Sequence, residues 1–242
     1  MELLTLQQNK IHRIFIDNKI SIGININIAD ETLNHVKNSL RIKNEDNILI
    51  FNGDGKEYLA KINYNAKEMI LNVMDVIRHN EVDTHEIILL QCISSTKSMN
   101  LTIQKSVELG ISKIIPIISD RCQPGSYNKK KSNWEKIIIS ATEQSHGLFI
   151  ADIDDATHFE EIVNNAKYND YKKLCFHIDG RTITKSDKSG KKHIILIGPE
   201  GGFSNSEIKL LEKYNWSIIK LGDRVFRSET AAIVAQSTLR NY

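Results

Sequence analysis

Two glycine-containing loops in the second half of the chain have residue types and a spacing that could bind a ligand. The first follows an apolar run at 193–197 and reads Gly198-Pro-Glu-Gly-Gly-Phe-Ser204. Its two adjacent glycines, 201 and 202, carry no side chain, so a ligand could lie directly against the main chain. Ser204 and Glu207 have the S-x-x-E spacing of a capping box, which predicts a helix start. Ligands of α/β sheets usually bind at such strand ends, although a tight turn without a ligand fits the Gly-Gly pair about equally well.

The second loop occupies the same place in the next strand–loop–helix unit. It reads Leu221-Gly-Asp-Arg-Val-Phe-Arg-Ser-Glu-Thr-Ala231. The basic residues Arg224 and Arg227 lie close to Glu229, and the three could simply form a surface salt bridge of little energetic value. Two such loops at successive strand ends nevertheless favour one shared ligand.

The sequence lacks the common signatures of other ligand and nucleophile sites. It contains no G-x-x-x-x-G-K-[ST] string for phosphates, and neither loop has the G-x-G-x-x-G spacing of a dinucleotide fold. It has no G-x-S-x-G elbow for an esterase serine. The histidines are scattered, and Cys92, Cys122 and Cys175 are solitary, so we expect no metal site.

Hydrophobic periodicity divides the chain into two parts. Isoleucines alternate with polar residues from 20 to 28, and further strands are predicted at 47–52, 56–64 and 68–77, with one short helix at about 31–40. From about residue 78, strands and helices alternate, which indicates a mostly parallel sheet. Predicted strands there are 87–93, 114–118, 174–178, 193–197 and 217–221, and predicted helices are 100–109, 133–145, 205–214 and 229–240.

Bulk composition sets broad limits. The 242 residues carry a net charge of +2, so any contact with nucleic acid must come from a local basic patch. No apolar stretch approaches the roughly 20 residues needed to span a bilayer, and the first residues do not look like a signal peptide. Three unpaired cysteines fit a reducing compartment, and we therefore expect a cytoplasmic protein without membrane contact.

Five blocks of sequence, taken in order, resemble the SPOUT (α/β-knot) RNA methyltransferases. They lie at 102–110, 120–122, 141–145, 197–204 and 221–231. The likeness is strongest to the bacterial family that methylates N3 of a uridine in 16S ribosomal RNA. In the first part of the chain, 35–41 and 53–55 resemble the PUA-like RNA-binding domain of that family.

The resemblance implies a two-domain α/β protein. Residues 1–76 would form a small PUA-like β-barrel, and residues 77–242 a trefoil-knotted SPOUT domain with a mostly parallel sheet. It also implies a homodimer and a bent S-adenosylmethionine bound among the knot loops. By position in the motifs, the cofactor residues would be Leu196, Ile197, Gly198, Pro199, Glu200, Gly201, Gly202, Leu221, Gly222, Val225, Arg227, Thr230 and Ala231.

The implied reaction suggests roles for charged residues. Uracil N3 carries a proton, so an efficient site should remove that proton or stabilise the anion that forms on the ring oxygens. Arg121 and Arg227 are the candidates for anion stabilisation, and Glu143 or Glu229 for the base. The 16S RNA of the small subunit would be the partner, and the candidates for RNA contact are Arg13, Arg41, Lys97, Lys105 and Arg121.

Alternative functions stay open from sequence alone. One is a SPOUT methyltransferase that acts on another RNA or another position. A second is a catalytically silent RNA-binding knot protein, which the intact loop at 221–231 disfavours. A third is an unrelated α/β enzyme that binds a nucleotide, which the missing phosphate signatures disfavour.

Overall fold

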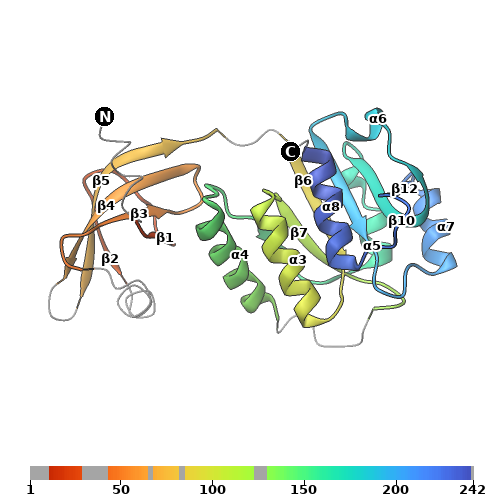
Figure 1. Cartoon of the computed structure of the whole chain (residues 1–242), viewed down its shortest axis with the longest axis horizontal. Coiled ribbons are helices and arrows are strands. Elements are labelled where there is room, and N and C mark those ends of the chain that lie inside the picture. Colours follow the sequence, from red (N-terminus) through yellow and green to blue (C-terminus); the bar gives the residue numbers. More distant parts are fainter. Residues whose placement is uncertain (1–10, 29–42, 65–67, 82–84, 123–129, 241–242) are drawn as a thin grey trace. The chain divides into compact units, whose positions relative to one another are not determined.

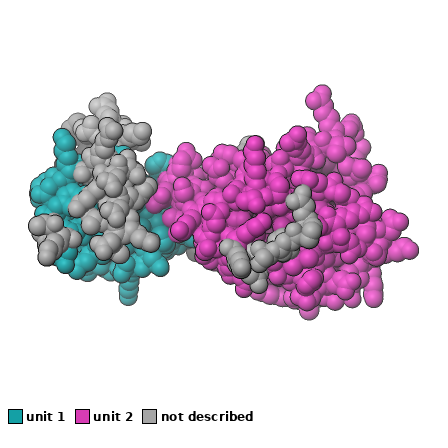
Figure 2. Space-filling view, turned by 90° about the horizontal axis from the view of Figure 1, so that it is seen from below, with its two compact units in different colours: residues 1–82, 146–150 teal, residues 83–145, 151–242 magenta. Residues whose placement is uncertain are grey.

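The computed structural model describes residues 11–28, 43–64, 68–81, 85–122 and 130–240. The chain divides into two compact units: unit 1 is Met1–Val82 with His146–Ile150, and unit 2 is Asp83–Ser145 with Ala151–Tyr242 (Figure 2). The predicted helix at about 31–40 and the predicted RNA contact Arg41 lie outside the described residues. In the described ranges, no helix is both long and apolar enough to cross a membrane.

Unit 1 is built on a mixed sheet of five strands among its described residues, in the order β1-β3-β4-β5-β2. The first pair, β1 with β3, is parallel and the other pairs are antiparallel. Alternate residues of these strands face a core of isoleucines, Met69 and Leu71. The strands are β1 (Arg13–Phe15), β2 (Asn25–Ile28), β3 (Asn47–Phe51), β4 (Lys56–Tyr64) and β5 (Met69–His79).

The sheet of unit 1 is a mixed half-barrel of the PUA-like kind, which agrees with the predicted small PUA-like barrel. Its two edges, β1 and β2, do not pair with each other among the described residues. The alternation at 20–28 predicts one long strand, but the strand covers only Asn25–Ile28. Two further backbone hydrogen bonds join Gly23 and Ile24 to Val73 of β5. Gly23 has a φ of +82° and turns the chain, which leaves Ile22 58% exposed. The alternation of isoleucines therefore predicted a longer strand than the structure contains.

Unit 2 contains a parallel sheet in which the described strands run in the order β12-β10-β11-β6-β7-β8, with β9 also on β7. Its central strands are buried on both faces, which explains their nearly continuous apolar sequence. The five predicted strands are confirmed, and two short ones were not foreseen. The strands are β6 (Glu86–Cys92), β7 (Lys113–Ile118), β8 (Asp152–Ile153), β9 (Thr157–His158), β10 (Lys172–Thr182), β11 (Lys192–Ile197) and β12 (Ser217–Lys220).

Helices connect these strands and cover the sheet. Helix α3 packs on both α4 and α8, and α5 packs on α7 (Figure 1). All four predicted helices of unit 2 are present, and Gly110 has the positive φ expected after the end of α3. The helices are α3 (Thr96–Glu108), α4 (Lys131–Ser145), α5 (Phe159–Val163), η2 (Ala166–Tyr168), α6 (Lys185–Lys188), α7 (Asn205–Lys213) and α8 (Ser228–Arg240).

The chain returns from the sheet edge to its middle at the C-terminal end. Strand β12 is an edge strand, yet the helix that follows it, α8, packs on β11, β6 and α3 (Figure 1). Near this crossing, Gly180 lies so close to Ile219 that a Cβ would come within 2.5 Å of the backbone carbonyl carbon. Such a return is compatible with the predicted trefoil knot, which stays a prediction.

Candidate functional site

The candidate site is formed by the loops after β7, β11 and β12, together with the start of α8. Because the strands of unit 2 are parallel, their carboxyl ends meet at one edge of the sheet. Strand β6 lies between β11 and β7, so its carboxyl end is flanked by the first glycine loop and by the loop at 119–122. Sequence segments that lie about 80 residues apart are therefore neighbours at this edge.

The loop after β11 has an open backbone face. Gly202 has a φ of +69°, and its amide N donates to the carbonyl O of Pro199 at 2.9 Å. A Cβ added to Gly202 would meet nothing within 4 Å, whereas one added to Gly198 would come within 3.0 Å of the Phe203 ring. Gly198 thus permits close packing against the Phe203 ring, and Gly202 leaves room beside the main chain.

The predicted capping box at the end of this loop is confirmed. The Ser204 hydroxyl accepts from the amide of Glu207 at 3.2 Å, and the Glu207 carboxylate accepts from the amide of Ser204 at 2.8 Å. Both bonds satisfy amides that the first turn of α7 leaves without helical partners. The helix therefore begins directly after the loop and fixes its far end.

The second predicted loop is joined to the first through Ser228, the first residue of α8. Its hydroxyl donates to the carbonyl O of Gly198 at 2.9 Å and accepts from the side-chain amide of Gln91 at 2.8 Å. The neighbours of Ser228 in sequence, Arg227 and Glu229, are thereby held next to the first loop. Gln91 was not predicted, although a single amide inside the apolar run of β6 is a visible signal.

The loop after β7 is joined by three hydrogen bonds to the first loop and to the start of α7. Arg121 donates from Nη1 to the carbonyl O of Gly201 at 2.8 Å. The amide of Asp120 donates to Glu207 Oε1 at 3.0 Å, and the Ser204 hydroxyl donates to Asp120 Oδ2 at 2.6 Å. Arg121 therefore lies at the rim of the glycine loop, and its role in anion stabilisation stays a prediction.

Cys122 is the residue of this loop whose ionisation is most altered. A hydrogen bond from the buried Cys92 thiol is the main cause, and bonds from the side chain and amide of Ser119 add to it, so the pKa of Cys122 falls to about 6 despite partial burial. Burial raises the pKa of Cys92 well above its ordinary value. The two neighbouring thiols at this edge of the sheet therefore have pKa values shifted in opposite directions.

Several features of this edge fit the expected S-adenosylmethionine. The carbonyl O of the Gln91 side chain and the hydroxyl of Ser94 are buried at the end of β6 without a hydrogen-bond partner among the described residues. Such groups are costly to leave unpaired, and a polar ligand would satisfy them. Gly222, like Gly202, has open space where a Cβ would be. The edge therefore offers open backbone and unpaired polar atoms together.

The predicted cofactor residues occupy two kinds of environment. Leu196, Ile197 and Pro199 are buried. Val225 is 78% exposed, and the side chain of Arg227 is also exposed, with no hydrogen bond or ion pair to the rest of the described chain. The other members lie in the loops or in the first turn of α8 and are partly or fully exposed: Gly198, Glu200, Gly201, Gly202, Leu221, Gly222, Thr230 and Ala231.

The structure does not bring Glu143 into this group. It lies two residues before the end of α4, a helix whose first residue, Lys131, follows the loop after β7. With a rise of 1.5 Å per residue, Glu143 is about 18 Å along the helix from that start. This placement argues against its predicted role as the base within one chain, and it leaves Glu229 as the nearer carboxylate.

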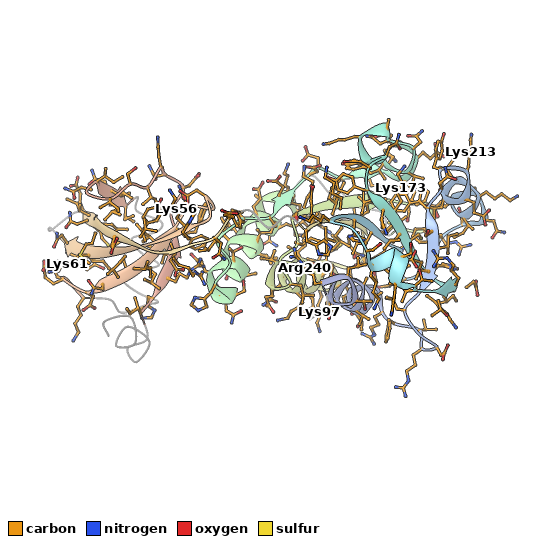
Figure 3. The ribbon with its side chains drawn as sticks, turned by 90° about the horizontal axis from the view of Figure 1, so that it is seen from above. Lys56, Lys61, Lys97, Lys173, Lys213 and Arg240 are labelled. Atoms are coloured by element: carbon orange, nitrogen blue, oxygen red, sulfur yellow. The ribbon has the colours of Figure 1, made fainter. Side chains whose placement is uncertain are left out.

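The basic residues predicted to bind RNA lie in different surroundings. Arg13 is buried in unit 1, where its Nε lies 2.6 Å from Glu57 Oε1 and its guanidinium stacks over Phe51. This burial argues against direct contact with RNA. Lys97 is exposed in the first turn of α3, the helix that follows the carboxyl end of β6 and therefore starts at the edge that carries the loops. Figure 3 labels this side chain. Lys105, further along α3, pairs with Glu108 at 2.8 Å.

A surface cavity of about 560 Å³ lies at the opposite edge of the sheet. It includes the starts of β10 and β12, and none of the predicted site residues lines it. Because ligands of parallel sheets bind at carboxyl ends, we assign the site to the loops and not to this cavity. Across the described ranges, no cluster of histidine, cysteine, aspartate and glutamate is arranged to hold a metal ion.

Comparison with protein families matches both parts of the chain. Residues 81–240 match the model described as the RNA methyltransferase domain, and residues 28–73 match the RNA methyltransferase PUA domain. Two similar proteins are each named ribosomal RNA small subunit methyltransferase E. The one from Mesomycoplasma hyopneumoniae is 34% identical over 85% of this chain and 89% of its own. The one from Buchnera aphidicola is 34% identical over 97% and 95%.

Solved structures agree with these matches. A Legionella pneumophila protein with bound S-adenosylmethionine is 33% identical, with a TM-score of 0.88 over 96% of this chain and 98% of that one. A Neisseria gonorrhoeae ribosomal RNA small subunit methyltransferase E, also bound to S-adenosylmethionine, is 28% identical, with a TM-score of 0.85 over 96% and 97%.

Proposed function

Because this chain belongs to the ribosomal RNA small subunit methyltransferase E family, we propose that it methylates N3 of one uridine in 16S ribosomal RNA. It is an S-adenosylmethionine-dependent ribosomal RNA methyltransferase. The single observation that carries the proposal at this site is the joining of three loops, through Ser228 to Gly198 and through Arg121 to Gly201, at one edge of the sheet. We also propose that it works in the cytoplasm.

The cofactor would be held mainly by main-chain atoms. When bound, S-adenosylmethionine supplies an electrophilic methyl group. The open faces of Gly202 and Gly222 would let the two loops approach it, and Gln91 and Ser94 would supply buried polar atoms. The side chains of this edge orient the ligand and exclude water, and such alignment contributes roughly 7–11 kcal/mol in well-oriented reactions.

Arg121 and Arg227 would stabilise the negative charge that develops on the uracil ring. Loss of the N3 proton leaves negative charge on the ring oxygens, and preorganised cationic donors stabilise such charge. Arg227 is exposed next to the loop after β12 and Arg121 next to the loop after β11, so each can reach a base bound between the loops. Glu229, in the first turn of α8, is our candidate for accepting the proton.

The RNA substrate must present an unpaired uridine. N3 lies on the Watson–Crick edge of the base, so it is inaccessible within a helix and the base must be splayed out. Lys97, in the first turn of α3, is our candidate to hold a phosphate of the substrate strand. We further propose a homodimer, for which light scattering should give twice the 27.6 kDa of one chain.

Two measurements test the function. Calorimetric titration with S-adenosylmethionine should show binding, and incubation with small subunits from a strain that lacks the modification should add one methyl group per particle. Mapping the modified nucleotide by mass spectrometry then decides the position. A methyl group at another base or position would support a different member of the class, and cofactor binding without transfer to any RNA would indicate a silent RNA-binding protein.

A further inference from the structure

Glu207 is a buried carboxylate with partners in two different loops. It is 5% exposed at the start of α7. One oxygen accepts from the amide of Ser204, which is the capping bond, and the other accepts from the amide of Asp120 in the loop after β7. A helix cap requires only the first of these bonds. The second bond joins two loops whose strands are not neighbours in the sheet.

The same connection is made a second time by a hydroxyl. Ser204 accepts from the amide of Glu207 and donates to the Asp120 carboxylate at 2.6 Å. Because β6 lies between β11 and β7, these bonds pass over the carboxyl end of β6. Arg121 immediately follows Asp120, and its guanidinium reaches the carbonyl O of Gly201 on the far side.

We propose that Glu207 is a positioning residue for Arg121. It fixes the backbone of the loop at 119–122 against the loop at 198–204, and so holds the exposed guanidinium at the rim where a base would bind. The inference rests on the proposed function, in which Arg121 stabilises charge on the uracil. Arg121 by itself has one hydrogen bond to the first loop, so its direction depends on the backbone that carries it.

The first experiment replaces the carboxylate by an amide of the same shape, Glu207→Gln. Glutamine offers one oxygen to two amides, so its NH₂ group faces an N–H and one loop-to-loop or capping bond is lost. We expect kcat to fall by roughly tenfold to a hundredfold, since small misplacements of a reacting group cost that much. The dissociation constant of S-adenosylmethionine, measured by calorimetry, should change much less.

A double-mutant cycle separates positioning from general damage. The variants are Glu207→Gln, Arg121→Ala and the combination, each measured for kcat on small subunits. If Glu207 acts through Arg121, the double variant is no slower than Arg121→Ala alone. If the two losses multiply, or if Arg121→Ala leaves kcat unchanged, the inference is wrong.

The matched control is Asp187→Asn. Asp187 is a buried capping-box carboxylate at the start of α6, but its other partner is Arg181 rather than a loop of the site. The Asp187→Asn variant should have a lower thermal stability than the wild type and an unchanged kcat. An equal fall of kcat in Asp187→Asn and Glu207→Gln would reduce the role of Glu207 to helix capping and overturn the proposal.

A milder variant covers the case in which Glu207→Gln does not fold. Ser204→Ala keeps the Glu207 carboxylate and the bond it accepts from the Asp120 amide. It removes the hydroxyl that donates to the Asp120 carboxylate and accepts from the Glu207 amide. Its smaller loss of kcat should also vanish in the Arg121→Ala background. The wild-type protein separates the two hypotheses. If it methylates no RNA, the proposed function fails, whereas a methylating wild type with independent Glu207 and Arg121 effects contradicts only this inference.

Discussion

At the scale of single residues, Arg227 is the side chain whose role can be tested most directly. It is exposed, and no hydrogen bond or ion pair joins it to the described chain, so its removal should leave the fold intact. We predict that Arg227→Ala lowers kcat by about 10²-fold, the usual loss when one oxyanion donor is removed. The dissociation constant of S-adenosylmethionine should change little.

Arg224→Ala is the control for this change, because Arg224 is an equally exposed arginine in the same loop. Its kcat should stay close to that of the wild type. If Arg227→Ala weakens cofactor binding as much as it lowers kcat, Arg227 is a cofactor ligand, which is the other role that its place in the motifs suggests.

Cys122 gives a prediction about pH. Its pKa is lowered to about 6, chiefly by the hydrogen bond from Cys92, and the thiolate is the form that reacts with alkylating agents. The alkylation rate of Cys122 by iodoacetamide should therefore rise between about pH 5 and 7 and be nearly constant above. Peptide mass spectrometry of pulse-labelled protein measures it.

The other two cysteines are internal controls for that experiment. Cys92 and Cys175 are buried, and burial raises the pKa of each thiol. Both should remain unlabelled in the folded protein and become labelled in denaturant. A Cys122 rate that keeps rising up to pH 9 would contradict the proposed hydrogen-bond arrangement.

Local sequence signals predicted some contacts of the site and not others. The S-x-x-E spacing predicted both bonds between Ser204 and Glu207, because a capping box is made by residues three apart. The bond from Asp120 to Glu207 spans 87 positions and depends on how strands are ordered in the sheet. The burial of Arg13 could not be predicted for the same reason, because its partner Glu57 lies far away in the sequence.

At the scale of helices and strands, long periodic segments were predicted well and short ones were not. The apolar runs of β6, β7 and β11 and the four long helices of unit 2 appear within a few residues of their expected bounds. Strands β8 and β9 have two residues each, too few for a period to show. Their pairing with β7 is a tertiary effect.

Strand β10 carries a prediction about glycine. A Cβ at Gly180 would lie 2.5 Å from the backbone of Ile219, a distance that real side chains do not reach. Gly180→Ala should therefore push β10 from β12 and lower the free energy of unfolding by about 1–3 kcal/mol, as overpacking does. Urea denaturation followed by circular dichroism measures this loss.

Gly201→Ala is the comparison for stability. Its Cβ would come no closer than 3.4 Å to Arg121, so the free energy of unfolding should hardly change. If both variants unfold at the same urea concentration as the wild type, the close approach of Gly180 to Ile219 is not a feature of the protein in solution.

At the scale of the whole molecule, the sequence indicated two parts but not the full membership of each. The change of period near residue 78 suggested domains 1–76 and 77–242. The compact units instead assign His146–Ile150 to unit 1, where Gly147 and His146 provide carbonyl groups to Arg13 and Arg78. Nothing in a five-residue segment with ordinary composition reveals such an assignment, and independently folding domains stay a prediction.

The net charge of the molecule leads to the last prediction. At +2, the whole chain attracts a polyanion only weakly, so binding of RNA must rely on a few lysines and arginines placed near phosphates. Each phosphate contact to a single strand contributes a slope of about −0.7 to a plot of log affinity against log salt. We expect a steep negative slope for the wild type on the small subunit. Lys97→Ala should make that slope shallower by about one contact.

The control for this measurement is Lys173→Ala, because Lys173 (labelled in Figure 3) lies at the start of β10 and lines the cavity at the opposite edge of the sheet. Its removal lowers the net charge by the same amount as Lys97→Ala, so a general effect of charge would change both slopes equally. If Lys97 contacts a phosphate, only the slope of Lys97→Ala should become shallower. A salt-independent affinity for the wild type would count against phosphate contacts as the basis of substrate binding.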